Sequence, residues 1–323
     1  MKICKRRFHA WLAAIMMIIC VIATSVVPAS AASTGYFNSY SNVDSIANKG
    51  GCVSMQGIAV GSTYLYTIKI KTDNTKAFIS KTNKNTGATT ILTDTSTNSK
   101  YINYIGHAND MDVCSVDGKS HLFIATMNTG SQSIVRFKVN GSKITKVGNY
   151  TLKLNGENVN VSGIEILKKT SSQITLLVKK GYTFYTGTIA TNAKSGTINL
   201  TKAFSIDVTN VKINGKAMDL SSYITQGFAY YKGKLFFPLT GPSDKLNVSI
   251  IAVYNVDGAS GTITADPKLS FRITSSSYSA LFEIEGCGIS SSDGKLYFNT
   301  NRRKTNSDTN HDGIHVFKGY TFS

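Results

Sequence analysis

Short apolar stretches separated by turn residues recur along the chain after about residue 35. Five copies of one unit can be recognised, in which a polar residue heads a small apolar strand, a turn containing glycine follows, and an apolar-aromatic strand comes next. The copies are headed at spacings of 54, 52, 64 and 59 residues by Gln56, Asp110, Ser162, Gln226 and Glu285. Further strand-like runs, such as SIVRFKV and SIIAVYNV, lie between the copies, so each unit has about four strands.

Four antiparallel strands repeated at this period are typical of a β-propeller blade, because a blade buries both of its faces only by stacking on neighbours in a ring. The chain is therefore predicted to be all-β, a five-bladed β-propeller, with residues 32–323 as a single domain. The strands near residues 35–45 are expected to complete the last blade. A β-sandwich would also be rich in strands, but it would not explain one unit that recurs at comparable spacing.

The first 31 residues have the pattern of a secretory signal peptide. A basic segment at residues 2–7 precedes an apolar stretch at residues 10–27, and Ala29-Ser30-Ala31 supplies a small-x-small cleavage site. We expect cleavage after Ala31 and a secreted, extracellular, monomeric protein; a retained membrane anchor is the alternative. No second apolar run of spanning length follows. Three cysteines remain after cleavage, so at most one disulfide can form within the chain.

Composition supports a folded chain with a basic surface. Apolar residues make up 41% and charged residues 16%, which is enough apolar material for a large core. Beyond residue 31 there are 31 basic and 18 acidic residues, and the basic ones are scattered singly, as in KIKTDNTK, VKK and NRRK. A cationic surface outside the cell attracts anionic polymers. No nucleic-acid partner is expected, because no basic patch with interleaved aromatic residues occurs.

The polar heads of the repeated strands are predicted to meet. If each of these strands lies innermost in its blade, the five polar residues form one ring at the mouth of a central channel. They would either satisfy buried backbone groups and channel waters or bind a ligand. Asn109 and Asp112 flank Asp110, while Glu283 shares a strand face with Glu285. The predicted binding residues are Gln56, His107, Asn109, Asp110, Gln226, Glu283 and Glu285.

Carboxylates from two blades are also the groups that glycoside hydrolysis uses, one protonated and one ionised. In that case Asp110 and Glu285 would be the acid and the base, with His107 as a helper, since the pKa of a histidine lies near neutral pH. A single histidine on a turn also serves structural roles. No complete catalytic motif occurs in the chain, which lacks GxSxG, HExxH, P-loop and Rossmann patterns, so an enzymatic role is not favoured.

A possible metal site lies near the end of the chain. Asp308, Asn310 and Asp312, followed by Gly313, match the first half of a calcium-binding loop, where alternate residues supply oxygen ligands. The acidic twelfth position of an EF-hand is Gly319 here, so the match is partial and a polar hairpin turn is the alternative. No other cofactor is expected.

Four stretches resemble the helveticin J family of large, heat-labile bacteriocins: VGSTYLYTIKI (60–70), GHANDMDV with HLFIATM (106–127), TQGFAYYKGKLFF (225–237) and EIEGCGISSSDGKLYF (283–298). They follow the order found in that family, but this chain carries a Sec-type leader and no tryptophan beyond residue 31. The resemblance implies a secreted antimicrobial protein that binds a bacterial cell-envelope polymer or surface glycan. The residues leave two alternatives: an extracellular glycoside hydrolase or lyase that uses channel carboxylates, and a non-catalytic carbohydrate-binding adhesin.

Overall fold

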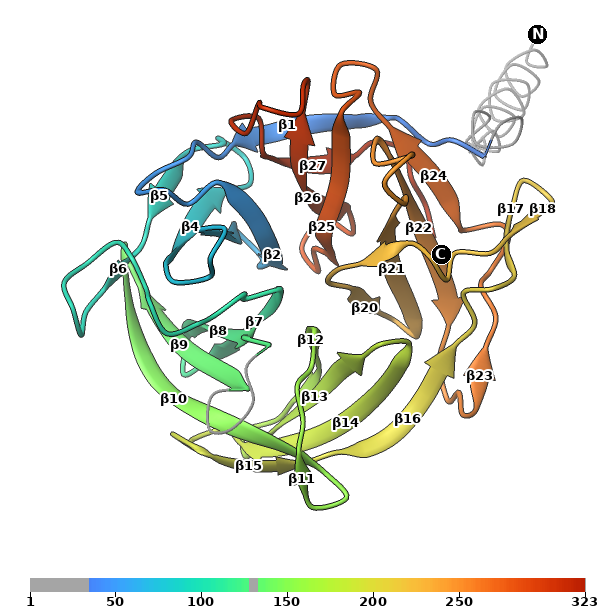
Figure 1. Ribbon diagram of the computed structural model, residues 1–323. Coiled ribbons are helices and arrows are strands. Elements are labelled where there is room, and N and C mark those ends of the chain that lie inside the picture. The colour runs from blue at the N-terminus through green and yellow to red at the C-terminus, as the bar shows by residue number, and fades with distance from the viewer. Residues whose placement is uncertain (1–34, 128–132, 323) are drawn as a thin grey trace, which may run out of the picture.

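The chain forms a ring of β-sheets around a central axis (Figure 1). The computed structural model describes residues 35–127 and 133–322, and every regular element among them is a strand. Their strands make six sheets, of which five have at least four strands each. The prediction of an all-β propeller is confirmed. The predicted signal peptide, residues 1–31, lies outside the described residues.

Each of the five large sheets forms one blade. The first contains β2 (Ser54–Val60), β3 (Tyr64–Ile70), β4 (Ala77–Asn83) and β5 (Thr89–Ile91). The second contains β7 (Asp110–Val116), β8 (Lys119–Ala125), β9 (Ile134–Asn140) and β10 (Lys143–Leu154), and the third β12 (Gly163–Lys169), β13 (Gln173–Lys180), β14 (Thr183–Ala190) and β16 (Thr201–Ile206). The fourth contains β20 (Ala229–Tyr231), β21 (Lys234–Thr240), β22 (Val248–Asn255) and β24 (Phe271–Thr274), and the last β25 (Leu281–Ile289), β26 (Leu296–Arg303), β27 (Gly313–Phe317) and β1 (Tyr40–Ser45).

Short strands extend these blades at their edges. The second blade gains β6 (Thr93–Asp94), β11 (Glu157–Asn158) and β15 (Gly196–Asn199), the third gains β23 (Thr262–Ile263), and the fourth gains β19 (Ile224–Thr225). A separate hairpin of β17 (Val211–Ile213) and β18 (Lys216–Met218) makes the sixth sheet. The parallel pairing of β6 and β15 with β10 links the second blade to segments of its neighbours in the chain.

The repeated unit supplies the strand nearest the axis in every blade. These inner strands are β2, β7, β12, β20 and β25, and Figure 1 shows them around the centre of the ring. Neighbouring inner strands run in the same direction, because contacts between them advance together along both strands. Ile164 and Ile166 of β12 donate backbone hydrogen bonds to the side chains of Asp110 and Asp112 of β7. Gly286 and Gly288 of β25 lie against Ile58 and Val60 of β2, Gly57 and Gly61 lie against Asp110 and Val113, and Gly227 and Ala229 lie against Glu285 and Cys287. All five therefore begin at one end of the ring, which we call the mouth, and end at the opposite face.

The N-terminal strand closes the ring. β1 pairs antiparallel with β27, so that Tyr40 lies opposite Phe317, and the last blade is built from both ends of the described chain. This pairing confirms the expectation for residues 35–45. It also covers the edge of a sheet that would otherwise be exposed to pairing with another chain.

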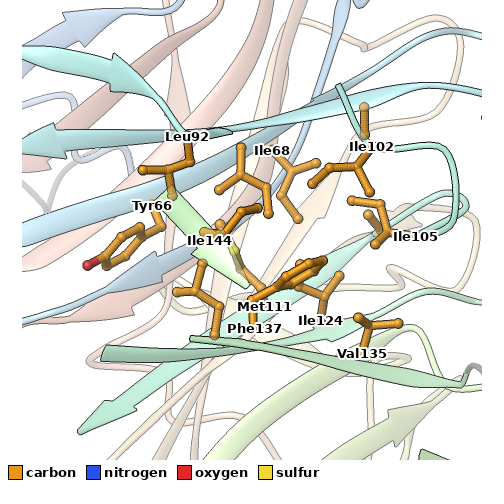
Figure 2. Packing of buried hydrophobic residues seen from close by; sticks show 14 of the residues in the cluster. Tyr66, Ile68, Leu92, Ile102, Ile105, Met111, Ile124, Val135, Phe137 and Ile144 are labelled. Atoms are coloured by element: carbon orange, nitrogen blue, oxygen red, sulfur yellow. The ribbon is translucent and has the colours of Figure 1, made fainter. Parts of the chain in front are cut away.

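Apolar side chains between the blades form the core. Between the first and second blades, Tyr66 and Ile68 pack with Met111, Ile124 and Phe137 (Figure 2). All of these residues are buried, and burial of each such side chain contributes about 1.5–3 kcal/mol to folding. Cys52, Cys114 and Cys287 are free cysteines, so packing of this kind, and no disulfide among the described residues, stabilises the ring.

Candidate functional site

Glycines allow the inner strands to approach one another closely at the centre. A Cβ atom on Gly57 would lie 2.6 Å from Cα of Asp110, and one on Gly227 would lie 2.5 Å from Oδ1 of the same aspartate. A Cβ atom on Gly163 would lie 3.2 Å from its Oδ2. Four copies of the repeat have glycine directly after the polar head, and the second copy has Asp110-Met111 instead. The Asp110 carboxylate occupies the space that the neighbouring glycines leave free.

Asp110 is held by backbone groups on both of its oxygens. Oδ1 accepts a hydrogen bond from the backbone N–H of Met111 at 3.0 Å, and Oδ2 accepts one from Ile164 at 3.0 Å. Burial raises the pKa of Asp110, while the Ile164 hydrogen bond and the charge of Lys179 oppose that shift. Burial also lowers the pKa of Lys179 to about 8. With 1% of its surface exposed, Asp110 joins two blades and is out of reach of a substrate.

Glu283 and Glu285 form a pair of carboxyl groups at the mouth. Burial raises the pKa of Glu285 well above its ordinary value, and the charge of Glu283 and a hydrogen bond with it raise it further. Asn301 on β26 donates its amide to Oε1 of Glu285, whereas Oε2 is buried and faces no donor. That environment suits a protonated Glu285, whose O–H is itself the donor. Glu283 is only partly buried, so the pair reaches the surface through it.

Gln226 and His107 lie beside this pair. Gln226 donates its side-chain amide to Oε1 of Glu283 at 3.0 Å. Nδ1 of His107 lies 3.1 Å from Oδ1 of Asn74, and because an amide oxygen only accepts, the ring proton is on Nδ1 and Nε2 keeps a lone pair. Burial lowers the pKa of His107, and the charge of Glu283 partly offsets this shift. A neutral imidazole is therefore present near the Glu283–Glu285 pair, whose inner member Glu285 has a raised pKa.

A second carboxyl pair lies farther along the inner strands. Asp112 accepts backbone hydrogen bonds from Val113 at 2.6 Å and Ile166 at 2.7 Å, and burial raises its pKa to about 6. Burial also raises the pKa of Glu165 well above its ordinary value, with further increases from the charges of Asp112 and Asp110 and a hydrogen bond to Asp112. Asp112 repeats the role of Asp110, since it connects β7 to β12.

The remaining predicted binding residues have structural contacts. Asn109 donates its side-chain amide to the backbone oxygen of Ser162 at 2.7 Å, and both it and Gln56 are buried. The Ser162 backbone N–H bonds to Lys179. Thus the structure brings Gln226, Glu283 and Glu285 together at the mouth and places Asp110 in the closed interior. Asp110 and Glu285 do not form an exposed acid-base pair.

The proposed calcium ligands have partners within the protein. Asp312 is buried and its carboxylate lies 2.9 Å from Nζ of Lys69, which is itself buried. Asp308 lies 2.8 Å from Nε2 of His311, and Asn310 accepts a hydrogen bond from the backbone of Asn48. Among residues 35–127 and 133–322, no three His, Cys, Asp or Glu side chains gather as metal ligands would. Lys69 therefore holds the Asp312 end of this loop, and calcium binding there stays a prediction.

Sequence reasoning missed Asn301, Lys179 and Glu165. Lys179 and Lys69 lie in VKK and KIKTDNTK, whose scattered basic residues indicate a surface position, yet both lysines are fully buried. One signal was present: each stands at an alternating position of an apolar strand, and such positions face the interior. Asn301 carries no comparable signal, because its partners Met55 and Glu285 come from two other strands.

Comparisons with known proteins give structural similarity alone. Neither a protein-family model nor a curated protein sequence matches the chain. A GH43_1 enzyme from Xanthomonas citri has 7% identity and a TM-score of 0.46, over 86% of this chain and 89% of that one. RS223-Beta-xylosidase has 11% identity and a TM-score of 0.46, over 83% and 92%. The α-L-arabinofuranosidase PaAbf62A from Podospora anserina, solved with cellotriose, has 7% identity and a TM-score of 0.45, over 89% and 99%.

These similarities correct one expectation. The three solved structures just named are glycoside hydrolases, which contradicts the expectation of a bacteriocin-like antimicrobial protein, and that expectation is not carried further. At such identities and TM-scores, they do not assign an activity to this chain. The resemblance to the helveticin J family stays a prediction. No helix among the described residues has the length and apolar character needed to cross a membrane.

Proposed function

We propose that this protein is a secreted glycoside hydrolase that acts on a polysaccharide at the mouth of its ring. The observation that carries the proposal is the Glu283–Glu285 carboxyl pair. Its inner member is kept protonated by burial and its outer member is partly exposed. A carboxylic acid that stays protonated near neutral pH is the group needed to protonate a departing glycosidic oxygen.

The neighbouring residues suit the remaining steps. Glu285 gives its proton to Glu283, and Glu283, as the exposed member of the pair, passes that proton to the glycosidic oxygen while the bond from that oxygen to the anomeric carbon breaks. Neutral His107 takes a proton from the water that attacks the anomeric carbon, through its free Nε2. Gln226 and Asn301 hold the carboxyl groups in place through their amides.

A substitution of Glu283 tests this function. The wild type, Glu283→Gln and Glu157→Gln are incubated with labelled oligosaccharides, including xylo-, arabino- and cello-oligosaccharides, and released sugars are measured by chromatography. We expect Glu283→Gln to reduce turnover by about 10²–10⁴-fold, the usual contribution of positioned proton transfer. Glu157 is exposed on β11, so its amide should retain full activity. Full turnover in Glu283→Gln, with its fold intact, would overturn the assignment.

A non-catalytic carbohydrate-binding protein is the second candidate. The observation that favours it is the position of Asp110. Glycoside hydrolysis ordinarily uses two carboxyl groups on opposite sides of the bond, and two backbone donors close off this carboxylate from the second of these roles. Binding of a labelled oligosaccharide without any release of sugar, in the same experiment, would support this candidate and exclude the hydrolase.

A further inference from the structure

A separate pocket lies at the face opposite the mouth. It has a volume of about 340 Å³ and is lined by Tyr231, Lys232 and Lys234 together with Tyr320 and Phe322. Tyr231 is the last residue of β20, so the pocket lies where the inner strands end, whereas Glu283 lies where they begin. Its volume falls within the range of about 300–1,000 Å³ that small-molecule sites occupy.

The walls of the pocket are aromatic. The Phe322 ring packs edge-to-face against Tyr231, with ring centroids 5.9 Å apart, and against Phe236 at 5.1 Å. Tyr320 is fixed by a hydrogen bond from its hydroxyl to the backbone oxygen of Leu269 at 2.8 Å. Tyr231, Tyr320 and Phe322 are each only partly buried, so the core does not cover them completely. Rings with an apolar body and an accessible surface suit contact with an amphipathic ring such as a sugar.

Two lysines give the pocket a positive charge. Lys232 stands at the tip of the β20–β21 turn with φ +47°, in a turn that ordinarily favours Asn-Gly, and its Nζ lies 5.2 Å from the centroid of the Tyr231 ring. Lys234 donates to Oδ1 of Asn255 at 3.2 Å. Among the described residues neither lysine forms an ion pair.

Acidic residues do not line the pocket. Asp293, next to Gly294 of the lining, lies 3.6 Å from Lys84 and accepts the Tyr297 hydroxyl at 2.8 Å. Asp257 is exposed beside Gly233 and is not among the residues that line the pocket. The lining therefore combines two ammonium groups with three aromatic rings, and an anionic ligand matches its charge.

We propose that this pocket binds a carboxylate-bearing sugar unit of an anionic polysaccharide. The sugar ring lies against Tyr320 and Phe322, and its carboxylate meets the ammonium groups of Lys232 and Lys234. A uniformly anionic polymer without a sugar ring would use only the lysines, and a neutral sugar only the rings. The site is distinct from the Glu283–Glu285 pair and does not depend on the proposed hydrolysis.

The test compares matched ligands and matched variants. Binding of oligogalacturonate and of its methyl ester, which lacks the negative charges, is measured by calorimetry in the Glu283→Gln background. We expect the acid to bind at least about tenfold more tightly than the ester, which corresponds to about 1.4 kcal/mol. The double variant Lys232→Glu/Lys234→Glu should remove this preference, while Phe322→Ala should weaken binding of both ligands.

A control of equal charge keeps the result specific. Lys212→Glu/Lys216→Glu changes two exposed lysines of the β17–β18 hairpin by the same total charge and should leave oligogalacturonate binding unchanged. Equal weakening by both double variants would show that only net charge attracts the ligand, and would overturn the site. If polyphosphate bound as tightly as oligogalacturonate and lost this binding in Lys232→Glu/Lys234→Glu, the assignment to a sugar would be overturned. In the wild-type background, Lys232→Glu/Lys234→Glu should hydrolyse neutral oligosaccharides as fast as the wild type, because the pocket is separate from the mouth.

Discussion

The substitution Asp110→Asn tests whether the hydrogen bonds of Asp110, which join two blades, stabilise the fold. Both carboxylate oxygens of Asp110 accept backbone N–H groups, from Met111 and Ile164, at 3.0 Å each. Asparagine has the same shape but one accepting oxygen, so one of the two buried N–H groups must face an amide N–H₂ and lose its partner. Leaving a buried donor unpaired costs about 1–3 kcal/mol. Loss of the negative charge near buried Lys179 adds to this cost, so we expect a decrease of about 2–4 kcal/mol in the free energy of unfolding.

Equilibrium unfolding in urea measures this change, with Asp117→Asn as the control. Asp117 is exposed at the tip of the same β7–β8 hairpin and has φ +50°, a conformation that asparagine tolerates well. We expect its unfolding free energy to stay within about 0.5 kcal/mol of the wild type, as for most surface substitutions. If Asp110→Asn were as stable as Asp117→Asn, the reasoning that Asp110 joins two blades would be refuted. If it were equally stable and also lost turnover, Asp110 would be a reacting group.

Two further predictions concern buried basic groups. Burial and the charge of Arg136 lower the pKa of His121 to about 4, so as the pH falls the unfolded chain takes up this proton before the folded chain does. The free energy of unfolding should therefore fall by about 3 kcal/mol between pH 6.5 and pH 4. Thermal unfolding of His121→Gln over the same pH range should lack this loss. Lys69→Met leaves the buried carboxylate of Asp312 without its cation and should cost about 3–5 kcal/mol in urea unfolding. Replacement of exposed Lys71 by Met is the control, and an equal effect would contradict the prediction.

The inner strands and the closure of the ring could be predicted from the sequence. Each polar head followed by a short apolar strand became an inner strand, and the segment 40–45 completed the last blade. These features depend on local alternation and on recurrence at a regular spacing, which a single chain displays directly. The residues that meet at the mouth were also foreseen in part, because Gln226 and Glu283 lie near strand starts that converge in any ring.

Only the tertiary structure decided which carboxyl groups can react. Asp110 and Glu285 occupy equivalent places in the repeat, yet Asp110 is fixed by Ile164 of the next blade, whereas Glu285 pairs with Asn301 and reaches the surface through Glu283. The sequence shows that a residue is acidic, but its burial and its hydrogen-bond partners come from strands 16 to 54 residues away. The pKa of each group depends on those partners.

The burial of two lysines and the lining of the second pocket were also decided by the tertiary structure. Lys69 and Lys179 belong to segments that look like ordinary surface, and only the packing of neighbouring strands shows that they are buried. The lysine and aromatic walls of the pocket come from residues 231–234 and 320–322, which are almost 90 residues apart. Local patterns determine which strands form, because they depend on neighbours in sequence. Ligand sites depend on side chains that the closed ring brings together, and this information is absent from any single segment.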